Sequence, residues 1–390
     1  MSSVNFLEKL LDGVEVEWMP LGKAAKYSDS RINSTQVNQF NYVGVDNILQ
    51  NRAGKINSSY VPSEGRLIEY RKGDILIGNI RPYLKKIWLA NNSGGASGDV
   101  LVIRSTHKAL SSEYLHQVLT DDKFFAYNMQ HAKGAKMPRG DKAKILEYSI
   151  PIPCAENPKK SLEIQAEIVR ILDTMTAHTA ELTAELTARK KQYNYYRDKL
   201  LSFEDGEVEW KKLGDLAENL DSKRKPITSG LREAGSIPYY GASGIVDYVK
   251  DYIFDGDYLL VSEDGANLLA RNTPIAFSIS GKSWVNNHAH VLKFDTYAER
   301  RYVEYYLNGI DLTPYISGAA QPKLNKKNLE GILIPNPTLN EKERIVALLD
   351  KFDALTASIT EGLPREIELR QKQYAYYRDL LLSFPKPPTI

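Results

Sequence analysis

Apolar residues recur at alternating steps of three and four in two long segments of this chain. The first segment runs from Ile164 to Leu200 and the second from Ile345 to Leu381. Such spacing places apolar side chains along one stripe of an α-helix, as in the seam of a coiled coil. Each segment predicts a helix of about 60 Å, at 1.5 Å of rise per residue. Because neither stripe is stable in water, we expect the two helices to pack together as an antiparallel pair.

The rest of the chain shows short apolar runs broken by Gly and Asn turns. Strand-like runs lie at 74–78, 99–103, 258–261 and 290–294, and shorter helices are expected near 112–128 and 299–309. This mixture predicts the fold class α+β. Two α/β-mixed domains would be joined by two long helices that form an antiparallel coiled coil, with pseudo-two-fold symmetry. The alternative is that each long helix is the core of a separate domain.

The chain also contains an internal repeat. Lys191-Gln-Tyr-Asn-Tyr-Tyr-Arg-Asp198 returns as Lys372-Gln-Tyr-Ala-Tyr-Tyr-Arg-Asp379, and Glu15-Val-Glu-Trp18 returns as Glu207-Val-Glu-Trp210. Between these landmarks the two halves share little, which indicates two different domains on one common frame. A molecule with internal two-fold symmetry suits a partner with two similar halves, and duplex DNA is the commonest such partner.

The repeat predicts six segments. They are an N-terminal helix at 1–12 that completes a circular repeat, a first divergent domain at 13–157, a central helix at 158–203, a second divergent domain at 204–338, a C-terminal helix at 339–385 and a tail at 386–390.

Each long helix contains one unusual segment. The first holds a tandem four-residue unit: Thr179, Ala180, Glu181 and Leu182, then Thr183, Ala184, Glu185 and Leu186. Adding or removing one unit changes the helix length by about 6 Å and rotates its far end by about 40°. In the second helix, Pro364 follows Gly362 by two positions, and we expect the proline to kink or restart the helix.

Basic residues gather at the same place in both divergent domains, although the whole chain is nearly balanced, with 51 Lys and Arg against 49 Asp and Glu. A polar loop before each Pro-x-Pro carries cations that suit phosphate contact and base-edge reading. The candidate DNA-binding residues are Lys133, Lys136, Arg139 and Lys142 in the first domain, Lys323, Lys326 and Lys327 in the second, and Arg81, Lys85 and Lys86 after a predicted strand. A solvated charged loop is the alternative, but the equivalent placement favours DNA.

Catalytic and metal-binding signatures are missing from the sequence. Gly281-Lys282-Ser283 lacks the earlier glycine of a phosphate-binding loop, and His288 and His290, which we expect on one face of a strand, have no third metal ligand nearby. We expect no catalytic residues and no bound metal. One cysteine, no membrane-length apolar run and no signal-peptide pattern predict a protein of the reducing cytoplasm. The chain is typical of a recognition module.

These residues resemble one protein family along essentially the full chain. The Thr-Ala-Glu-Leu tandem, the Lys-Gln-Tyr-x-Tyr-Tyr-Arg-Asp motif and Gly362-Leu-Pro-Arg-Glu-Ile-Glu-Leu-Arg370 are similar to the specificity (S) subunit of type I restriction–modification systems, and to its type IC subgroup. Asn286-Asn-His-Ala-His-Val-Leu292 and Gly95-Ala-Ser-Gly-Asp-Val-Leu101 resemble segments of its target recognition domains.

The resemblance implies a role for each part. The two divergent domains would be target recognition domains, each of which reads one half of a bipartite, asymmetric site on double-stranded DNA. The coiled coil would act as the spacer ruler, because the number of Thr-Ala-Glu-Leu units is linked to spacer length in this subgroup. Two modification subunits would dock on the helices, bind S-adenosylmethionine and methylate adenine. Two restriction subunits would use ATP and Mg, and this chain itself would bind no cofactor.

Two other classes of function are weighed against this one. The first is a complete methyltransferase–nuclease with fused recognition domains, which the length and the missing cofactor motifs disfavour. The second is a coiled-coil adaptor whose domains bind protein instead of DNA. Salt-dependent DNA binding would separate the adaptor from a DNA-recognition subunit.

Overall fold

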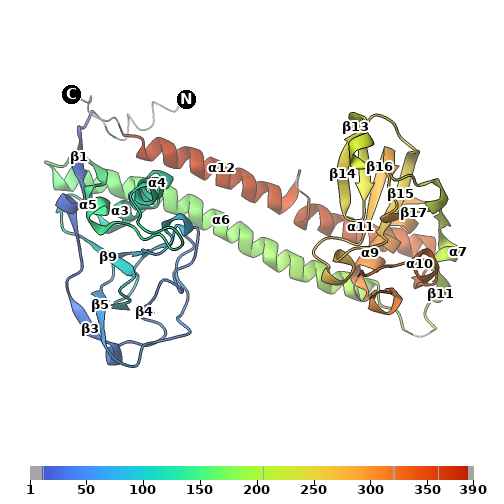
Figure 1. The fold of residues 1–390 in the computed structure, drawn as a ribbon, viewed down its shortest axis with the longest axis horizontal. Helices are drawn as coiled ribbons and strands as arrows, with labels where there is room; N and C mark the ends of the chain where they lie inside the picture. The colour runs from blue at the N-terminus through green and yellow to red at the C-terminus, as the bar shows by residue number, and fades with distance from the viewer. Residues whose placement is uncertain (1–10, 12, 205, 319–320, 359, 385–390) are drawn as a thin grey trace. The chain divides into compact units, whose positions relative to one another are not determined.

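The computed structural model describes residues 11, 13–204, 206–318, 321–358 and 360–384, which form two compact units (Figure 1). The first unit holds residues up to Glu181 and from Glu368 onward, and the second holds residues from Leu182 to Ile367. Each unit thus contains one divergent domain and parts of both long helical segments. The N-terminal helix predicted at 1–12 and the tail predicted at 386–390 lie outside the described residues, apart from Leu11.

The first unit contains two four-stranded sheets, ordered β2-β9-β6-β7 and β3-β5-β8-β4, and a separate antiparallel pair, β1-β10. Its elements are β1 (Val16–Pro20), α2 (Leu21–Ala24), β2 (Ala25–Tyr27), β3 (Arg31–Asn33), β4 (Tyr42–Val43), β5 (Arg66–Tyr70), β6 (Ile75–Gly78), β7 (Ile87–Leu89), β8 (Gly94–Ala96), β9 (Val100–Ser105), α3 (Ser112–Leu119), α4 (Asp122–Gln130), α5 (Lys142–Glu147) and β10 (Ser149–Pro153).

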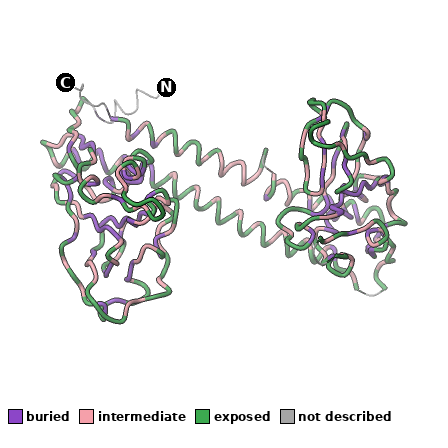
Figure 2. The backbone as a smooth tube through the Cα atoms, in the orientation of Figure 1, coloured by how far each residue is buried: buried purple, intermediate pink, exposed green. Residues whose placement is uncertain are grey.

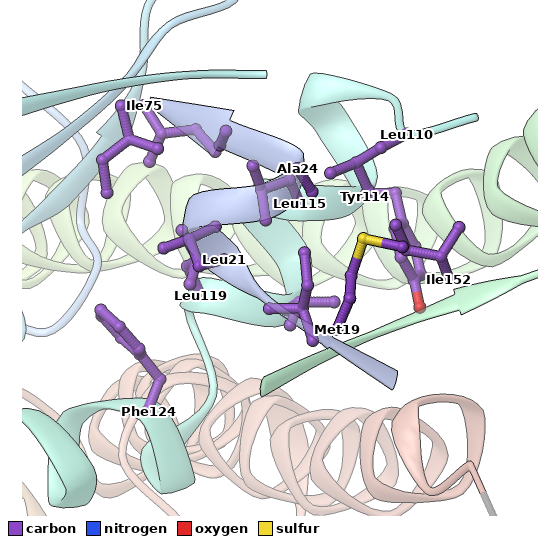
Figure 3. Packing of buried hydrophobic residues seen from close by; sticks show 14 of the residues in the cluster. Met19, Leu21, Ala24, Ile75, Leu110, Tyr114, Leu115, Leu119, Phe124 and Ile152 are labelled. Atoms are coloured by element: carbon purple, nitrogen blue, oxygen red, sulfur yellow. The ribbon is translucent and has the colours of Figure 1, made fainter. Parts of the chain in front are cut away.

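The core of the first unit lies between its sheet, its short helices and the long helices. Figure 3 shows Leu21 of α2, Leu115 of α3 and Ile152 of β10 packed in this core. Tyr114 is fully buried there, and its hydroxyl donates a 3.0 Å hydrogen bond to the carbonyl of Pro151. This bond satisfies the one polar group that the ring carries into the core.

The second unit contains one six-stranded sheet, ordered β12-β17-β15-β16-β13-β14, and a separate antiparallel pair, β11-β18. Its elements are β11 (Glu209–Lys212), α7 (Leu213–Leu216), β12 (Glu218–Asn219), β13 (Ala234–Gly241), β14 (Gly244–Val249), β15 (Phe254–Ser262), α8 (Asn267–Ala270), β16 (Ala276–Val285), β17 (Ala289–Lys293), α9 (Tyr297–Gly309), α10 (Lys326–Glu330) and β18 (Leu333–Asn336). Only β13 and β16 pair in parallel among these strands.

Three helices form the long segments. Helix α6 (Pro158–Leu200) begins in the first unit and ends in the second, whereas α11 (Leu339–Thr356) begins in the second unit and α12 (Gly362–Leu382) ends in the first. The two long helical segments are therefore antiparallel: α6 leads from the first unit to the second, and α11 with α12 leads back. The predicted interruption near Pro364 is confirmed, because α12 restarts at Gly362, whose φ of +74° suits glycine.

Both long segments contribute to the core of each unit. In the first unit, Ile168 of α6 and Leu381 of α12 are buried in the same cluster. In the second unit, the ring of Phe352 on α11 stacks on Tyr196 at 5.8 Å and contacts Tyr193 at 6.2 Å. Figure 2 shows that the middle of α6, residues 173–190, has half-buried and exposed positions only. The predicted fold class, two mixed α/β domains with long antiparallel helices, is confirmed.

Repeated Leu-Gly pairs also have a structural reason. A side chain at Gly22 would press on Leu146 in the first unit, and one at Gly214 would press on Glu330 in the second. Each glycine thus allows the start of its domain to approach the helix that follows the basic loop. No helix in the described part of the chain is both long enough and apolar enough to span a membrane.

Candidate nucleic-acid interface

The basic loops of the two units have the same backbone geometry. The first basic loop comprises residues 133–141, and the second comprises residues 317–325, of which 319–320 lie outside the description. Lys133 and Arg139 exchange two main-chain hydrogen bonds of 2.9 Å, and Ser317 and Lys323 exchange two of 2.8 Å. Ser317 lies 184 positions after Lys133, and Lys323 lies 184 positions after Arg139. The repeat that is visible in sequence around these loops is therefore also a repeat of their fold.

The first basic loop is tied to the end of an inner strand, β6. The amide of Gly140 donates to the carbonyl of Asn79 (3.3 Å), and the amide of Arg81 donates to the carbonyl of Pro138 (2.7 Å). A side chain at Gly140 would collide with the side-chain oxygens of Asn79 and Asn128, so only glycine fits at this position. These contacts fix the loop beside the residues that follow β6.

The second basic loop is tied in the same way to the end of β15. The amide of Leu324 donates to the carbonyl of Glu263 (2.7 Å), and the amide of Gly265 donates to the carbonyl of Pro322 (3.2 Å). Each partner again lies 184 positions after its counterpart, since 263 − 79 and 265 − 81 give the same value. Because main-chain atoms make these bonds, the frame does not depend on which side chains it presents.

Ion pairs orient the cations of the first basic loop. Lys133 lies 2.7 Å from Asp141, and this contact together with main-chain hydrogen bonds holds the pKa of the Asp141 carboxyl below its usual value. Arg139 lies 3.2 Å from Asp99, and about half of each side chain is exposed. Lys136 is exposed and makes no ion pair with the described residues. A loop of this kind can offer its cations to an anionic partner.

A buried charge network holds the second basic loop. Lys323 lies 3.0 Å and Arg224 2.6 Å from the Glu263 carboxylate. Burial raises the pKa of Glu263, but the hydrogen bonds from Arg224 and Lys323 outweigh burial and leave it below its usual value. The ring of His290 bridges Asp221, at 2.6 Å, and the carbonyl of Leu324, at 2.7 Å.

The expected placement of the two histidines on one strand face is wrong. His288 precedes β17, is half exposed, and contacts Asp264 at 2.9 Å, whereas His290 lies within β17 and is fully buried. Because His288 stands outside the strand, strand alternation does not constrain it.

Asp221, Glu263 and His290 place ligand atoms within 4.8 Å of one another, a spacing that a metal ion could use. Arg224 and Lys323 already pair with these carboxylates. We therefore interpret the group as an ion-pair network that holds the second basic loop to the sheet.

The remaining candidate cations of the two loops differ in whether they form an ion pair. Lys142 and Lys327 are exposed and make no ion pair with other described residues, and Lys326 pairs with Glu330 at 3.5 Å one helical turn away. Exposed pairs of this kind contribute at most about 1 kcal/mol and exchange readily for another anion.

The three candidates after β6 occupy three different environments. Arg81 is exposed. Lys85 pairs with Asp122 at 2.7 Å and is about one-third exposed. Lys86 is buried and donates a 2.6 Å hydrogen bond to the carbonyl of Val45, so its charge points into the domain. We leave Lys86 out of the proposed interface for this reason.

Sequence reasoning missed the residues that position the loops. Asn79 and Glu263 occupy equivalent places at the strand ends, yet they differ in type and in neighbours. The offset of 184 positions from the loops would have aligned them. Nothing in the local sequence marks Asp221 or His290 as members of one network, because the two residues are far apart in the chain and meet only in the folded unit.

Comparison with known proteins identifies the family. A model described as the type I restriction modification DNA specificity domain matches residues 19–190 and again residues 206–369. The chain belongs to the type I restriction–modification DNA specificity family. The two matches cover the two halves of the internal repeat and most of the chain.

Relatives and solved structures agree with this assignment. The chain is 38% identical to the Escherichia coli type I restriction enzyme EcoR124I/EcoR124II specificity subunit, with all of both chains covered, and 34% identical to the E. coli EcoprrI specificity subunit, with 93% of each covered. The crystal structure of an S subunit from M. genitalium matches with a TM-score of 0.59 at 13% identity, and covers 96% of this chain and 98% of its own. At that identity the structural likeness shows the fold alone.

Proposed function

We propose that this chain is the DNA-recognition subunit of a type I restriction–modification complex and that each unit reads one half of a bipartite, asymmetric site. The main support is the pair of basic loops, which have one backbone geometry but different side chains. Equivalent frames would approach the two half-sites in the same way, and different side chains would read different bases. Members of the same family are named specificity subunits, which agrees with this division.

Helix α6 is the proposed spacer ruler. The boundary between the two units falls between Glu181 and Leu182, inside the Thr-Ala-Glu-Leu tandem. The tandem is uninterrupted helix, and its residues are half-buried or exposed. A change of one four-residue unit would therefore alter the length between the recognition domains by about 6 Å without disturbing either core.

The catalytic steps are assigned to partner subunits. Modification subunits would bind S-adenosylmethionine and methylate adenine, and restriction subunits would use ATP and Mg, so that this chain itself needs no cofactor. The complex would act in the cytoplasm, where the chromosome lies. Adenine methylation requires the base to leave the duplex stack, which a subunit that grips both half-sites would favour.

Two equivalent grooves support the expectation of two copies of the modification subunit. In the first unit, Trp18 and Phe384 line a groove of about 630 Å³. In the second unit, Trp210 and Phe203 line one of about 310 Å³. Both grooves are built from the repeated strand and the repeated helix end, so one kind of partner could use both.

The direct test is to co-express the chain with its modification subunit in a host that lacks adenine methylation and to map N6-methyladenine by single-molecule sequencing. One bipartite, asymmetric motif with a fixed spacer is expected. A well-formed complex that leaves the genome unmethylated, and that binds DNA without salt dependence, would contradict the proposal and favour a protein-binding adaptor.

A further inference from the structure

Four cationic residues of the described chain have a left-handed backbone, which side chains other than glycine rarely adopt. They are Arg52 (φ +64°), Arg81 (φ +53°), Lys85 (φ +51°) and Arg271 (φ +53°). The conformation costs free energy that glycine would avoid, because Cβ crowds the backbone. At each position we therefore ask which contact of the side chain offsets this cost.

Contacts within the protein answer the question at three of the four positions. Arg52 donates to the carbonyl of Thr120 and pairs with Asp122, and Lys85 pairs with the same Asp122. Arg271 donates to the carbonyls of Leu307 and Ile310, at 3.3 and 2.6 Å. These three cations fasten one part of a unit to another.

Arg81 is the exception. Its side chain is exposed and makes no hydrogen bond, ion pair or ring contact with any residue that the structure describes. Its backbone is held at both sides, by the 2.7 Å bond from its amide to the carbonyl of Pro138 and by Pro82, which is buried at the start of the following turn. The main chain is thus fixed while the guanidinium is free.

The second unit shows what this backbone position requires. Gly265 is the counterpart of Arg81: its amide donates to Pro322 as that of Arg81 donates to Pro138, and its φ is +104°. The frame is therefore complete with a glycine at this place. Arg81 keeps a side chain where the fold needs none, beside the exposed cations of the first basic loop.

We propose that Arg81 determines specificity by reading a guanine in the half-site of the first unit, an inference that rests on the proposed recognition function. Guanine presents O6 and N7 side by side in the major groove, and the fork of a guanidinium can donate to both. Arg139 is paired with Asp99, and Lys86 is buried. Arg81 is an arginine beside the first basic loop whose guanidinium has no partner among the described residues, so it can make such a bidentate contact without giving up an existing one.

The test compares four complexes by mapping N6-methyladenine and by measuring methylation rates on duplexes that differ at single positions. They carry the unchanged chain, Arg81→Gly, Arg81→Asn, and Arg52→Gly as a matched control, because Arg52 is a left-handed arginine of the same unit whose side chain contacts the protein itself. Arg81→Gly suits the left-handed backbone and should fold normally, which hydrogen exchange of residues 75–89 will verify. Arg81→Asn, which also tolerates this conformation, serves as the second variant.

We expect the unchanged complex to require guanine at one position of one half-site, and Arg81→Gly and Arg81→Asn to lose that preference by about 5- to 150-fold. The other half-site and the spacer should stay the same, and Arg52→Gly should keep the full motif. An unchanged motif in both Arg81 variants would overturn the inference while the proposed function stands. Relaxation at a position without guanine, or uniform weakening with a lower salt slope, would also overturn it. Failure of the unchanged complex to give a bipartite motif would instead contradict the proposed function itself.

Discussion

The two units share a backbone frame but hold it with different side chains. Arg378 and Arg197 occupy the same place in the repeated helical motif. Arg378 is buried in the first unit and donates to the carbonyl of Gln117 (2.6 Å) and the hydroxyl of Thr120 (2.9 Å). In the second unit Arg197 pairs with its neighbour Asp198 at 2.7 Å. Motifs that differ only at Asn194 and Ala375 thus make different contacts in the two units.

The basic loops differ in the same way. Main-chain hydrogen bonds define both loops, and these bonds survive almost any change of side chain. The side chains around the loops differ between the units. At the strand end the first unit has the amide of Asn79, and the second has the carboxylate of Glu263, which belongs to a charge network. A frame made of backbone contacts lets recognition surfaces diverge while their placement is kept.

The largest expected effect comes from the segment that joins the units. Insertion of a third Thr-Ala-Glu-Leu unit after Leu186 should abolish methylation at the original sites, because the helix grows by about 6 Å. A motif with the same two half-sites and a longer spacer should replace it in a methylation map. An insertion of four residues inside the loop after Leu201 serves as a control that leaves α6 intact. An unaltered spacer in the tandem variant would rule out the ruler.

Removal of the two equivalent arginines should affect the units unequally. Arg378→Ala removes two buried hydrogen bonds and leaves the buried Asp121 carboxylate without its ion partner at 3.6 Å, and should lower the unfolding free energy of the first unit by about 3 to 5 kcal/mol. Arg197→Ala should cost the second unit less, about 1 to 2 kcal/mol, because its ion partner Asp198 is exposed and the main loss is the contact of the guanidinium with the Tyr193 ring. Hydrogen exchange in residues 112–130 and 297–309 of the purified complex measures both. Equal losses would mean that the buried environment of Arg378 does not matter.

The units should also differ in their response to acid. Counted from the helix caps Ser111 and Thr296, His116 of the first unit corresponds to Arg301 of the second. Burial, helped by the charge of Arg378, lowers the pKa of His116 to about 4. Between about pH 6.5 and pH 4 the histidine binds a proton in the unfolded chain but not in the folded unit. The unfolding free energy of the first unit therefore decreases as the pH is lowered through that window.

The loss in the first unit should reach about 2 to 3 kcal/mol below pH 4, reduced by the solvent contact of the half-buried ring. Exchange rates measured in both units of one sample provide the comparison. His116→Gln should flatten the profile of the first unit relative to the second. If the stability of the first unit depends on pH as steeply in His116→Gln as in the unchanged chain, other titrating groups are responsible.

The smallest effect concerns the cations of the first basic loop. Lys136→Ala and Arg139→Ala together should weaken DNA binding and lower the slope of log affinity against log salt by about 1 to 2, because fewer phosphates are neutralised. Lys108→Ala is the matched control, since Lys108 is exposed beyond the opposite end of β9. If affinity and slope do not change in the double variant, these residues lie away from DNA.

Sequence patterns predicted the frame well, for physical reasons. The long helices have a periodic apolar stripe, the Gly362–Pro364 break removes helical hydrogen bonds, and the repeated motifs mark equivalent places directly. The strands at 74–78 and 258–261 and the helices near 112–128 and 299–309 also form, as β6, β15, α3 with α4, and α9.

The candidate site could be predicted only in part. Basic residues near each Pro-x-Pro were visible as charge, but their pairing was not, because Asp99 meets Arg139 and Glu263 meets Lys323 only in the folded sheet. Burial of Lys86 depends on the carbonyl of Val45, far away in sequence. The left-handed backbone of Arg81 follows from the turn at Pro82 and the bond to Pro138, which no local pattern shows.

We expect the two units to read their half-sites independently, although they share one backbone frame. The most direct measurement replaces residues 13–157 with the corresponding domain of another family member and maps N6-methyladenine made by the complex. We predict that one half-site of the motif changes, while the other half-site and the spacer remain. A change in both half-sites, or a change in the spacer alone, would contradict the claim.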